Sequence, residues 1–193
     1  RPERPNQRNT EREPNCAFAT KMADFGKEME EHKFENGQLS IVGQDLEEIP
    51  LSFCDKYGSN TKRLDLSWNN ISTLKNLEKF PNLEELILDN NDLTSPLTFP
   101  KLPKLHTLWM NKNQINDVGA VFDKKVVAKN LPSLNYVSLL NNPGCPNELI
   151  QKDYEDYKRY RYFLLNRIPK LIFLDSNKVT PEERAEGQRI GHL

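Results

Sequence analysis

A nine-residue pattern of apolar and polar positions occurs three times in the middle of the chain. The copies span residues 63–71, 85–93 and 107–115, and each reads L-x-L-x-x-N-x-L, with other large apolar residues replacing some of the leucines. The asparagines at 69, 91 and 113 therefore recur every 22 residues. Because side chains alternate along a strand, each copy predicts a short strand whose two apolar residues face a core.

Two weaker copies flank the three regular ones. Gln44 takes the place of the asparagine in residues 39–46, and Asn142 takes it in residues 137–142. An asparagine side chain both donates and accepts hydrogen bonds, so a column of them can satisfy the backbone groups of buried turns. We therefore interpret the repeated leucines and asparagines as core residues and assign none of them to a functional site.

This pattern matches the leucine-rich repeat template, in which stacked repeats share one continuous core. The sequence predicts an α/β fold: a leucine-rich repeat solenoid of about five repeats, with short parallel strands on a concave face and a helical C-terminal cap. We expect residues 1–28 to be a disordered N-terminal segment, because they are charged and proline-rich. Residues 29–142 form the predicted repeat body, and residues 143–193 form the predicted cap.

Helices are predicted at four places. Residues 22–32 could form a short, weak helix, and the apolar spacing of residues 121–127 predicts one helix on the convex side. Residues 148–166 read as a long helix followed by a strand over residues 168–175. Thr180, Pro181 and Glu183 make a capping box, which predicts a final helix from that point.

Composition and motifs argue against several classes of function. The 193 residues carry a net charge of −1, so we expect no nucleic acid partner, and no apolar run is long enough for membrane insertion. The cysteines at 16, 54 and 145 form neither a metal pattern nor a disulfide framework, which favours a cytoplasmic location. Phosphate-loop and nucleophile-elbow motifs are absent, so we predict no enzyme activity, catalytic residue, cofactor or metal.

Outward-pointing residues of the strands supply the candidate binding site. Apolar side chains on a strand face that should be polar indicate an interaction surface, and tryptophan and tyrosine often dominate binding energy. The alternative is that such a tryptophan packs against a loop or the N-terminal segment. The candidate protein-binding residues are Arg63, Asp65, Trp68, Glu85, Ile87, Trp109, Lys112, Tyr136 and Leu140.

Cap residues carry a family resemblance. The stretch that runs from Tyr160-Arg161 through Leu164-Leu165, Ile168-Pro169 and Leu174-Asp175 to Glu183-Arg184 resembles the cap of intracellular leucine-rich repeat proteins. That family includes the spliceosomal U2 A-prime protein, acidic nuclear phosphoproteins and phosphatase regulators. Residues 145–149 (Cys-Pro-Asn-Glu-Leu) and 156–161 (Asp-Tyr-Lys-Arg-Tyr-Arg) resemble the branch associated with melanocyte differentiation.

The resemblance implies a non-catalytic cytoplasmic adaptor required for melanocyte differentiation and pigmentation. It implies a protein partner of the Rab-type GTPase class, action as a monomer, and a place in melanosome-related vesicle traffic at the periphery of endosomes or melanosomes. Two alternatives stay open: a nuclear ribonucleoprotein scaffold and a regulatory subunit of a protein phosphatase. Fold alone separates none of them.

Overall fold

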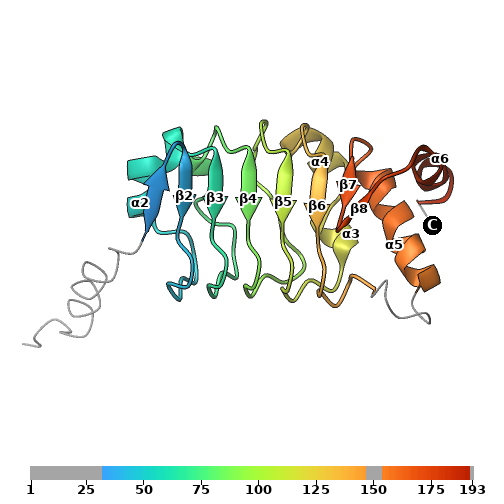
Figure 1. Ribbon diagram of the computed structural model, residues 1–193, viewed down its shortest axis with the longest axis horizontal. Helices are drawn as coiled ribbons and strands as arrows, with labels where there is room; N and C mark the ends of the chain where they lie inside the picture. Colours follow the sequence, from blue (N-terminus) through green and yellow to red (C-terminus); the bar gives the residue numbers. More distant parts are fainter. Residues whose placement is uncertain (1–31, 147–153, 192–193) are drawn as a thin grey trace, which may run out of the picture. The chain divides into compact units, whose positions relative to one another are not determined.

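The computed structural model describes residues 32–146 and 154–191, and the residues from Lys33 onward form one compact unit. An eight-stranded sheet runs through this unit in sequence order (Figure 1). The strands are β1 (Lys33–Glu35), β2 (Gln38–Ser40), β3 (Arg63–Asp65), β4 (Glu85–Ile87), β5 (Thr107–Trp109), β6 (Tyr136–Ser138), β7 (Phe173–Leu174) and β8 (Asn177–Lys178). The helices are α2 (Leu51–Tyr57), η2 (Gly58–Asn60), η3 (Leu77–Lys79), α3 (Val118–Val121), α4 (Lys124–Asn130), α5 (Tyr154–Arg167) and α6 (Pro181–Ile190).

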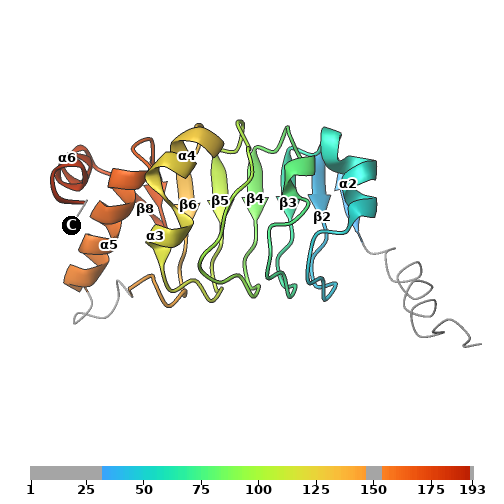
Figure 2. The same ribbon diagram turned by 180° about the vertical axis from the view of Figure 1, so that it is seen from behind.

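The predicted solenoid is confirmed by the strand pairing. Strands β2 to β7 pair in parallel, and each pairs with the strand of the following repeat. The residue facing the core holds one register through the body: Leu39, Leu64, Leu86, Leu108 and Val137 all lie side by side and are buried. The core therefore lies between the sheet and the helices and turns behind it, which Figure 2 shows from the back.

The predicted asparagine column is also present. The Asn113 side chain accepts a hydrogen bond from the Leu93 N–H at 3.0 Å and donates to the Leu88 carbonyl at 2.8 Å. Asn69, Asn91 and Asn142 repeat this pairing in their own turns. Each side chain thus forms hydrogen bonds with the backbone of the preceding repeat and holds adjacent repeats together.

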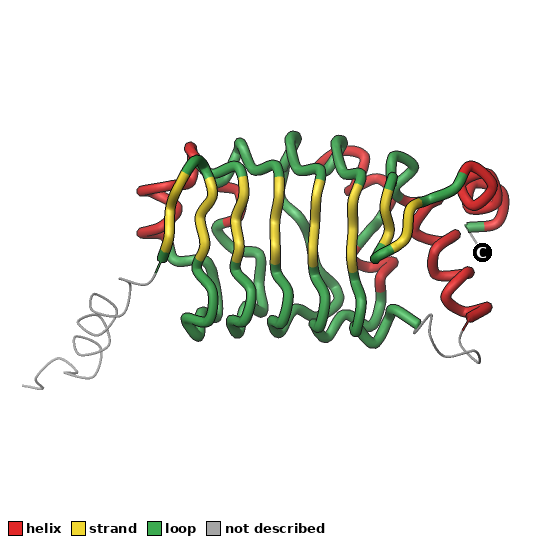
Figure 3. The backbone as a smooth tube through the Cα atoms, viewed as in Figure 1, coloured by secondary structure: helices red, strands yellow, loops and turns green. Residues whose placement is uncertain are grey.

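The N-terminal end of the sheet differs from the prediction. Strand β1 pairs antiparallel with β2 through a turn at Asn36 and Gly37, whose φ angles are 51° and 77°. Both angles lie in the left-handed region that Asn-Gly pairs favour in tight hairpins, so the dipeptide was a usable signal. The hairpin covers the open edge of the first repeat, and helix α2, which was not predicted either, lies behind it (Figure 3).

The convex-side helix predicted over residues 121–127 is two short helices. Asp117 caps α3 by accepting from the Ala120 N–H at 3.0 Å. Asp123 caps α4 by accepting from the Lys125 N–H at the same distance. The second cap interrupts the helix at the point where the apolar spacing had suggested continuity.

The cap is partly as predicted. Helix α6 starts at the capping box, in which the Thr180 hydroxyl accepts from the Glu183 N–H at 3.2 Å. The predicted strand is shorter than expected, because β7 contains two residues and turns back into β8. The start of the predicted long helix, residues 148–153, and most of the weak helix at 22–32 lie outside the described residues.

Candidate functional site

The outward-pointing side chains of the strands form the surface that we call the strand face. One column runs through Ser40, Asp65, Ile87, Trp109 and Ser138, which are neighbours in the sheet register. A second runs through Arg63, Glu85, Thr107, Tyr136 and Phe173. The alternation of the sequence therefore brings six of the nine candidate residues together on one surface. The other three, Trp68, Lys112 and Leu140, lie in the turns that follow β3, β5 and β6.

Three rings from different strands form an aromatic row: Trp109, Tyr136 and Phe173. The Trp109 and Tyr136 ring centroids are 5.3 Å apart at an interplanar angle of 15°, and those of Tyr136 and Phe173 are 5.9 Å apart at 33°. The Tyr136 hydroxyl donates to the Asp175 carbonyl at 3.1 Å, which fixes the central ring. The outer rings stay 37% and 38% exposed, so the row presents a rigid apolar surface to solvent.

Ile87 corrects one expectation. It was predicted to be an open apolar residue on the strand face, but only 8% of it is exposed. Its neighbours in the register are Asp65 on β3 and the larger Trp109 on β5. Ile87 therefore contributes little surface of its own to the strand face, and Leu140 is half-buried.

Polar groups on the strand face are held in place by hydrogen bonds. Asp65 accepts from the Ser67 hydroxyl at 2.7 Å, and Arg63 pairs with Glu85 across β3 and β4. Asp89 accepts from the Asn111 N–H at 2.7 Å, and partial burial raises the pKa of its carboxyl. These groups would meet a partner in fixed positions, which lowers the entropic cost of binding.

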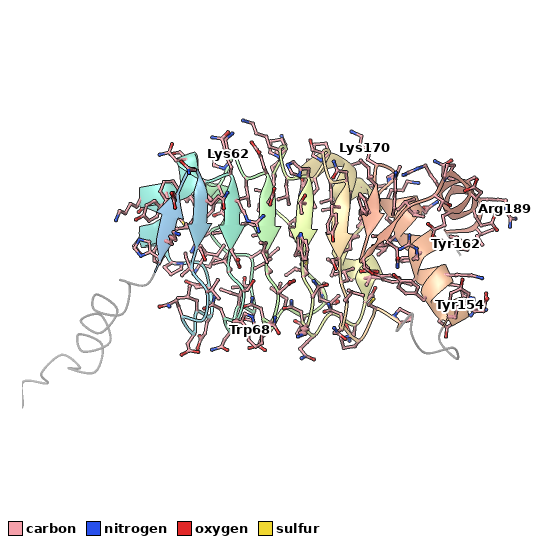
Figure 4. All side chains as sticks on the ribbon, viewed as in Figure 1. Lys62, Trp68, Tyr154, Tyr162, Lys170 and Arg189 are labelled. Atoms are coloured by element: carbon pink, nitrogen blue, oxygen red, sulfur yellow. The ribbon has the colours of Figure 1, made fainter. Side chains whose placement is uncertain are left out.

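Trp68 is unusual in both exposure and backbone geometry. It is 62% exposed, and its φ of 59° lies in the left-handed region. Equivalent positions in other repeats hold Asn90, Lys112 and Asn141, which all adopt a positive φ, and asparagine tolerates this conformation better than an aromatic residue. The Lys112 ammonium lies 5.8 Å from the centre of the indole ring. A strained residue that gains little burial is a functional candidate, and Figure 4 places it at the lower edge of the sheet.

Phe173 is a site residue that the sequence reasoning missed. The sequence predicted a strand over residues 168–175 as part of the cap, and Phe173 was not among the candidate binding residues. The signal was available, because the adjacent residues Phe173 and Leu174 of a strand point to opposite faces. In the structure Leu174 is buried and Phe173 points to the strand face beside Tyr136.

Residues 32–146 and 154–191 contain neither a metal-binding cluster nor a candidate membrane-spanning helix. In this part of the chain, no group of three or more histidine, cysteine, aspartate or glutamate side chains is arranged to hold a metal ion. No helix in the same ranges combines the length and the apolar character that crossing a membrane requires.

Comparison with known proteins places the chain. A profile described as "Leucine-rich repeat" matches residues 58–192. The human leucine-rich melanocyte differentiation-associated protein is 52% identical over 130 residues, which cover 65% of this chain and 65% of that protein. The U2 small nuclear ribonucleoprotein A' of Emericella nidulans is 34% identical over 131 residues, which cover 67% of this chain and 51% of that protein. This chain therefore spans less than two thirds of the length of either relative.

Solved structures agree on the fold. The crystal structure of the Drosophila melanogaster SNF/U2A' complex contains a chain that superposes with a TM-score of 0.63 at 20% identity. The match covers 86% of this chain and 91% of that one. At this identity the likeness concerns the fold alone. The profile match, the asparagine column and the parallel register lead to one conclusion: the chain belongs to the leucine-rich repeat family.

Proposed function

We propose that this protein is a non-catalytic adaptor that binds a folded protein through its strand face. The aromatic row carries this proposal, because a rigid and exposed stack of three rings is rare on a surface that has no partner. The similarity to the human melanocyte differentiation-associated protein supports a role in pigment-cell differentiation. We assign the partner to the Rab-type GTPases and the place of action to the cytoplasmic side of endosomes or melanosomes.

Two parts of the strand face would act together. Trp109 stands near the middle of the sheet and would enter an apolar depression of the partner as the central anchor. Trp68 and Lys112 form a second contact beyond the ends of β3 and β5. The Arg63–Glu85 pair and Asp89 would supply polar contacts around these anchors and fix the orientation of the partner.

The test is direct binding of the full chain to purified Rab-type GTPases in their GTP-like and GDP-bound forms. We expect Trp109→Ala to weaken binding at least about 30-fold, which corresponds to about 2 kcal/mol for a central aromatic residue. Leu51→Ala is the matched control, because Leu51 is also an exposed apolar residue but belongs to α2 behind the sheet. Equal affinities of the two variants would overturn the assignment to the strand face.

A second candidate function is a nuclear ribonucleoprotein scaffold. It is favoured by the similarity to U2 small nuclear ribonucleoprotein A' over two thirds of this chain. The two functions differ in what holds the complex together. If complexes captured from cells on the full chain disperse on RNase treatment, the scaffold function replaces the adaptor function. If they persist, the adaptor function stands.

A further inference from the structure

Lysine and arginine side chains that form no salt bridge gather along one edge of the solenoid, where the strands begin. We call this surface the basic edge and define it by Lys101, Lys104, Lys124, Lys129, Arg167 and Lys170. All the ion pairs found within the described residues involve other side chains. The six cations therefore lack a carboxylate partner within salt-bridge distance in that part of the chain.

Hydrogen bonds between successive turns make the basic edge continuous. The Asn130 amide donates to the Phe99 carbonyl at 2.8 Å, and the Ser133 hydroxyl donates to the Pro103 carbonyl at 2.7 Å. These bonds hold the turn that carries Lys101 and Lys104 against the end of α4. The Lys170 ammonium donates to the Pro132 carbonyl at 2.8 Å and so joins the cap to the same surface.

A groove of about 290 Å³ opens in the basic edge between α4 and the turn after α5. Its floor is apolar and includes Val127, Leu131 and Ile168, while Lys124, Arg167 and Lys170 stand around it. The Arg167 guanidinium lies over the Phe163 ring, 3.4 Å from its centre. Burial lowers the pKa of Arg167, and the negative charges of Asp123 and Asp117 oppose that effect. The groove thus combines cationic walls with an apolar base.

The opposite edge, where the chain leaves the strands, carries exposed carboxylates. They include Asp45 and Asp92, and the cation Lys112 lies at the same edge. Figure 4 places Lys62 and Lys170 at the upper edge and Trp68 at the lower one. The net charge of −1 therefore conceals a local group of cations at the basic edge, and such a group orients a molecule in an external electric field.

We propose that the basic edge docks onto the surface of a lipid bilayer rich in anionic phospholipids. Four to eight lysines and arginines in one cluster are characteristic of proteins held at such surfaces. The cations sit on neighbouring turns at the same end of the strands, so they can contact a plane together. Docking in this way leaves the strand face free for a protein, and the proposal does not depend on the function proposed above.

RNA fits the same surface less well. Proteins that read single-stranded RNA stack its bases on exposed aromatic rings. The exposed rings of the described residues near this region, Trp109 and Phe173, lie on the strand face, and Phe163 is covered by Arg167. Five of the six cations are lysines, which act as point charges and lack the planar fork with which arginine grips a phosphate.

The experiment is sedimentation of the full chain with phosphatidylcholine vesicles, with and without phosphatidylserine, at about 0.1 M salt, where charges interact over roughly 10 Å. The test variant carries Lys101→Gln and Lys124→Gln. The control carries Lys33→Gln and Lys75→Gln, which remove the same charge from cations that already pair with Glu35 and Glu48. Circular dichroism checks that both variants fold.

We expect the wild type to sediment with the vesicles that contain phosphatidylserine and not with phosphatidylcholine alone. The test variant should partition roughly 30-fold more weakly, about fivefold for each charge removed, and the control should match the wild type. Equal losses in both variants would mean that net charge alone drives binding and would overturn the proposal. Absence of wild-type binding to these vesicles, with retention of a single-stranded RNA oligonucleotide, would overturn it in favour of RNA.

Discussion

The central repeats and the C-terminal cap satisfy the same kind of buried backbone group with different side chains. In the repeats the partner is a neutral amide, as in Asn142, which accepts from the Ile115 N–H at 3.1 Å. In the cap the next place is taken by Asp175, which accepts from the Leu139 N–H at 2.9 Å. The amide can be copied from repeat to repeat, because it both donates and accepts. The carboxylate only accepts and therefore needs donors from elsewhere.

Helix α5 supplies those donors. The Tyr157 hydroxyl donates to Asp175 at 3.1 Å, and Tyr160 lies 3.4 Å from the other carboxylate oxygen. Arg161, which is 4% exposed, donates to the Leu174 carbonyl at 3.0 Å and pairs with Glu183 of α6. A repeating neutral column thus ends in a cluster of charged groups that joins β7, α5 and α6. The comparison shows that the solenoid is extended by repeating one neutral side chain, whereas its C-terminal end requires several different charged and hydroxyl side chains.

Asn113→Ala should have the largest effect, because it breaks the column in its middle. It leaves the Leu93 N–H without its side-chain acceptor. It also removes one donor each from the Leu88 and Met110 carbonyls, which keep their bonds from Asn91 and Asn142. The unpaired Leu93 N–H costs about 1–3 kcal/mol and each of the two lost bonds costs about 1 kcal/mol, so we expect the free energy of unfolding to fall by about 3–5 kcal/mol. Urea denaturation followed by circular dichroism measures it.

Asn70→Ala is the control for this experiment, since Asn70 is an exposed asparagine next to a column residue. Its effect should stay within about 0.5 kcal/mol, as for most surface substitutions. Similar losses in the two variants would show that the column has no special weight in the stability of the repeats.

Glu183→Ala should have the next largest effect, because it leaves the buried guanidinium of Arg161 without its carboxylate. The two side chains are 2.5 Å apart at their closest atoms. Removal of one partner from a buried pair costs about 3–5 kcal/mol, and the partial exposure of Glu183 places this case at the lower end. Because Glu183 also belongs to the capping box, Thr180→Ala is the control and should cost about 1 kcal/mol. Equal losses of unfolding free energy in the two variants would mean that Glu183 stabilises the protein only through the helix cap and not through its pair with Arg161.

The regular part of the fold follows from the sequence because each repeat encodes its own structure. The spacing of Asn69, Asn91 and Asn113 predicted both the inward residues and the sheet register, and the capping box at Thr180 predicted α6. These signals are local, so a single sequence contains them in full. The break at Asp123 is also local, but an aspartate inside an apolar pattern reads equally well as an exposed helical residue.

The strand face was less predictable, because the exposure of a side chain depends on its neighbours across the sheet. Trp109 was expected there, and it lies there. Ile87 points outward as expected, yet it is buried beside the larger Trp109. Phe173 joins Tyr136 through pairing of β7 with β6, and no repeat pattern relates those two strands. The exposure of side chains on the strand face therefore depends on the size of neighbouring side chains and on long-range strand pairing, which the repeat pattern does not specify.

Asp175→Asn should convert the end of the cap into another neutral member of the column. Burial raises the pKa of the Asp175 carboxyl above its ordinary value of 3.8, against the hydrogen bonds from Leu139 and Tyr157 that favour ionisation. A raised pKa in the folded state means that protonation favours folding. This contribution is complete below pH 3.8 and is lost as the pH rises through the folded-state pKa.

The variant does not titrate at this position, so its free energy of unfolding should decline less than that of the wild type as the pH rises above 3.8. We expect a gain of about 1 kcal/mol relative to the wild type for each unit by which the pKa is raised. Urea denaturation at a series of pH values measures both proteins. Parallel curves would mean that Asp175 keeps the same pKa in the folded and unfolded states.

Trp68→Asn should have the smallest effect on stability. Unlike the substitutions of Asn113 and Glu183, this change within a repeat should increase the free energy of unfolding. Trp68 adopts a φ of 59° where the corresponding residue of the next repeat is Asn90 at 55°. The left-handed conformation costs an ordinary residue about 1–2 kcal/mol, and asparagine adopts it more readily. Because the indole is 62% exposed, little packing is lost with it. We therefore expect the variant to be up to about 1 kcal/mol more stable in urea denaturation and to bind the partner of the strand face more weakly. A variant that unfolds at lower urea than the wild type would show that the tryptophan serves the stability of the repeats, and Trp109 would then be the anchor of the strand face without it.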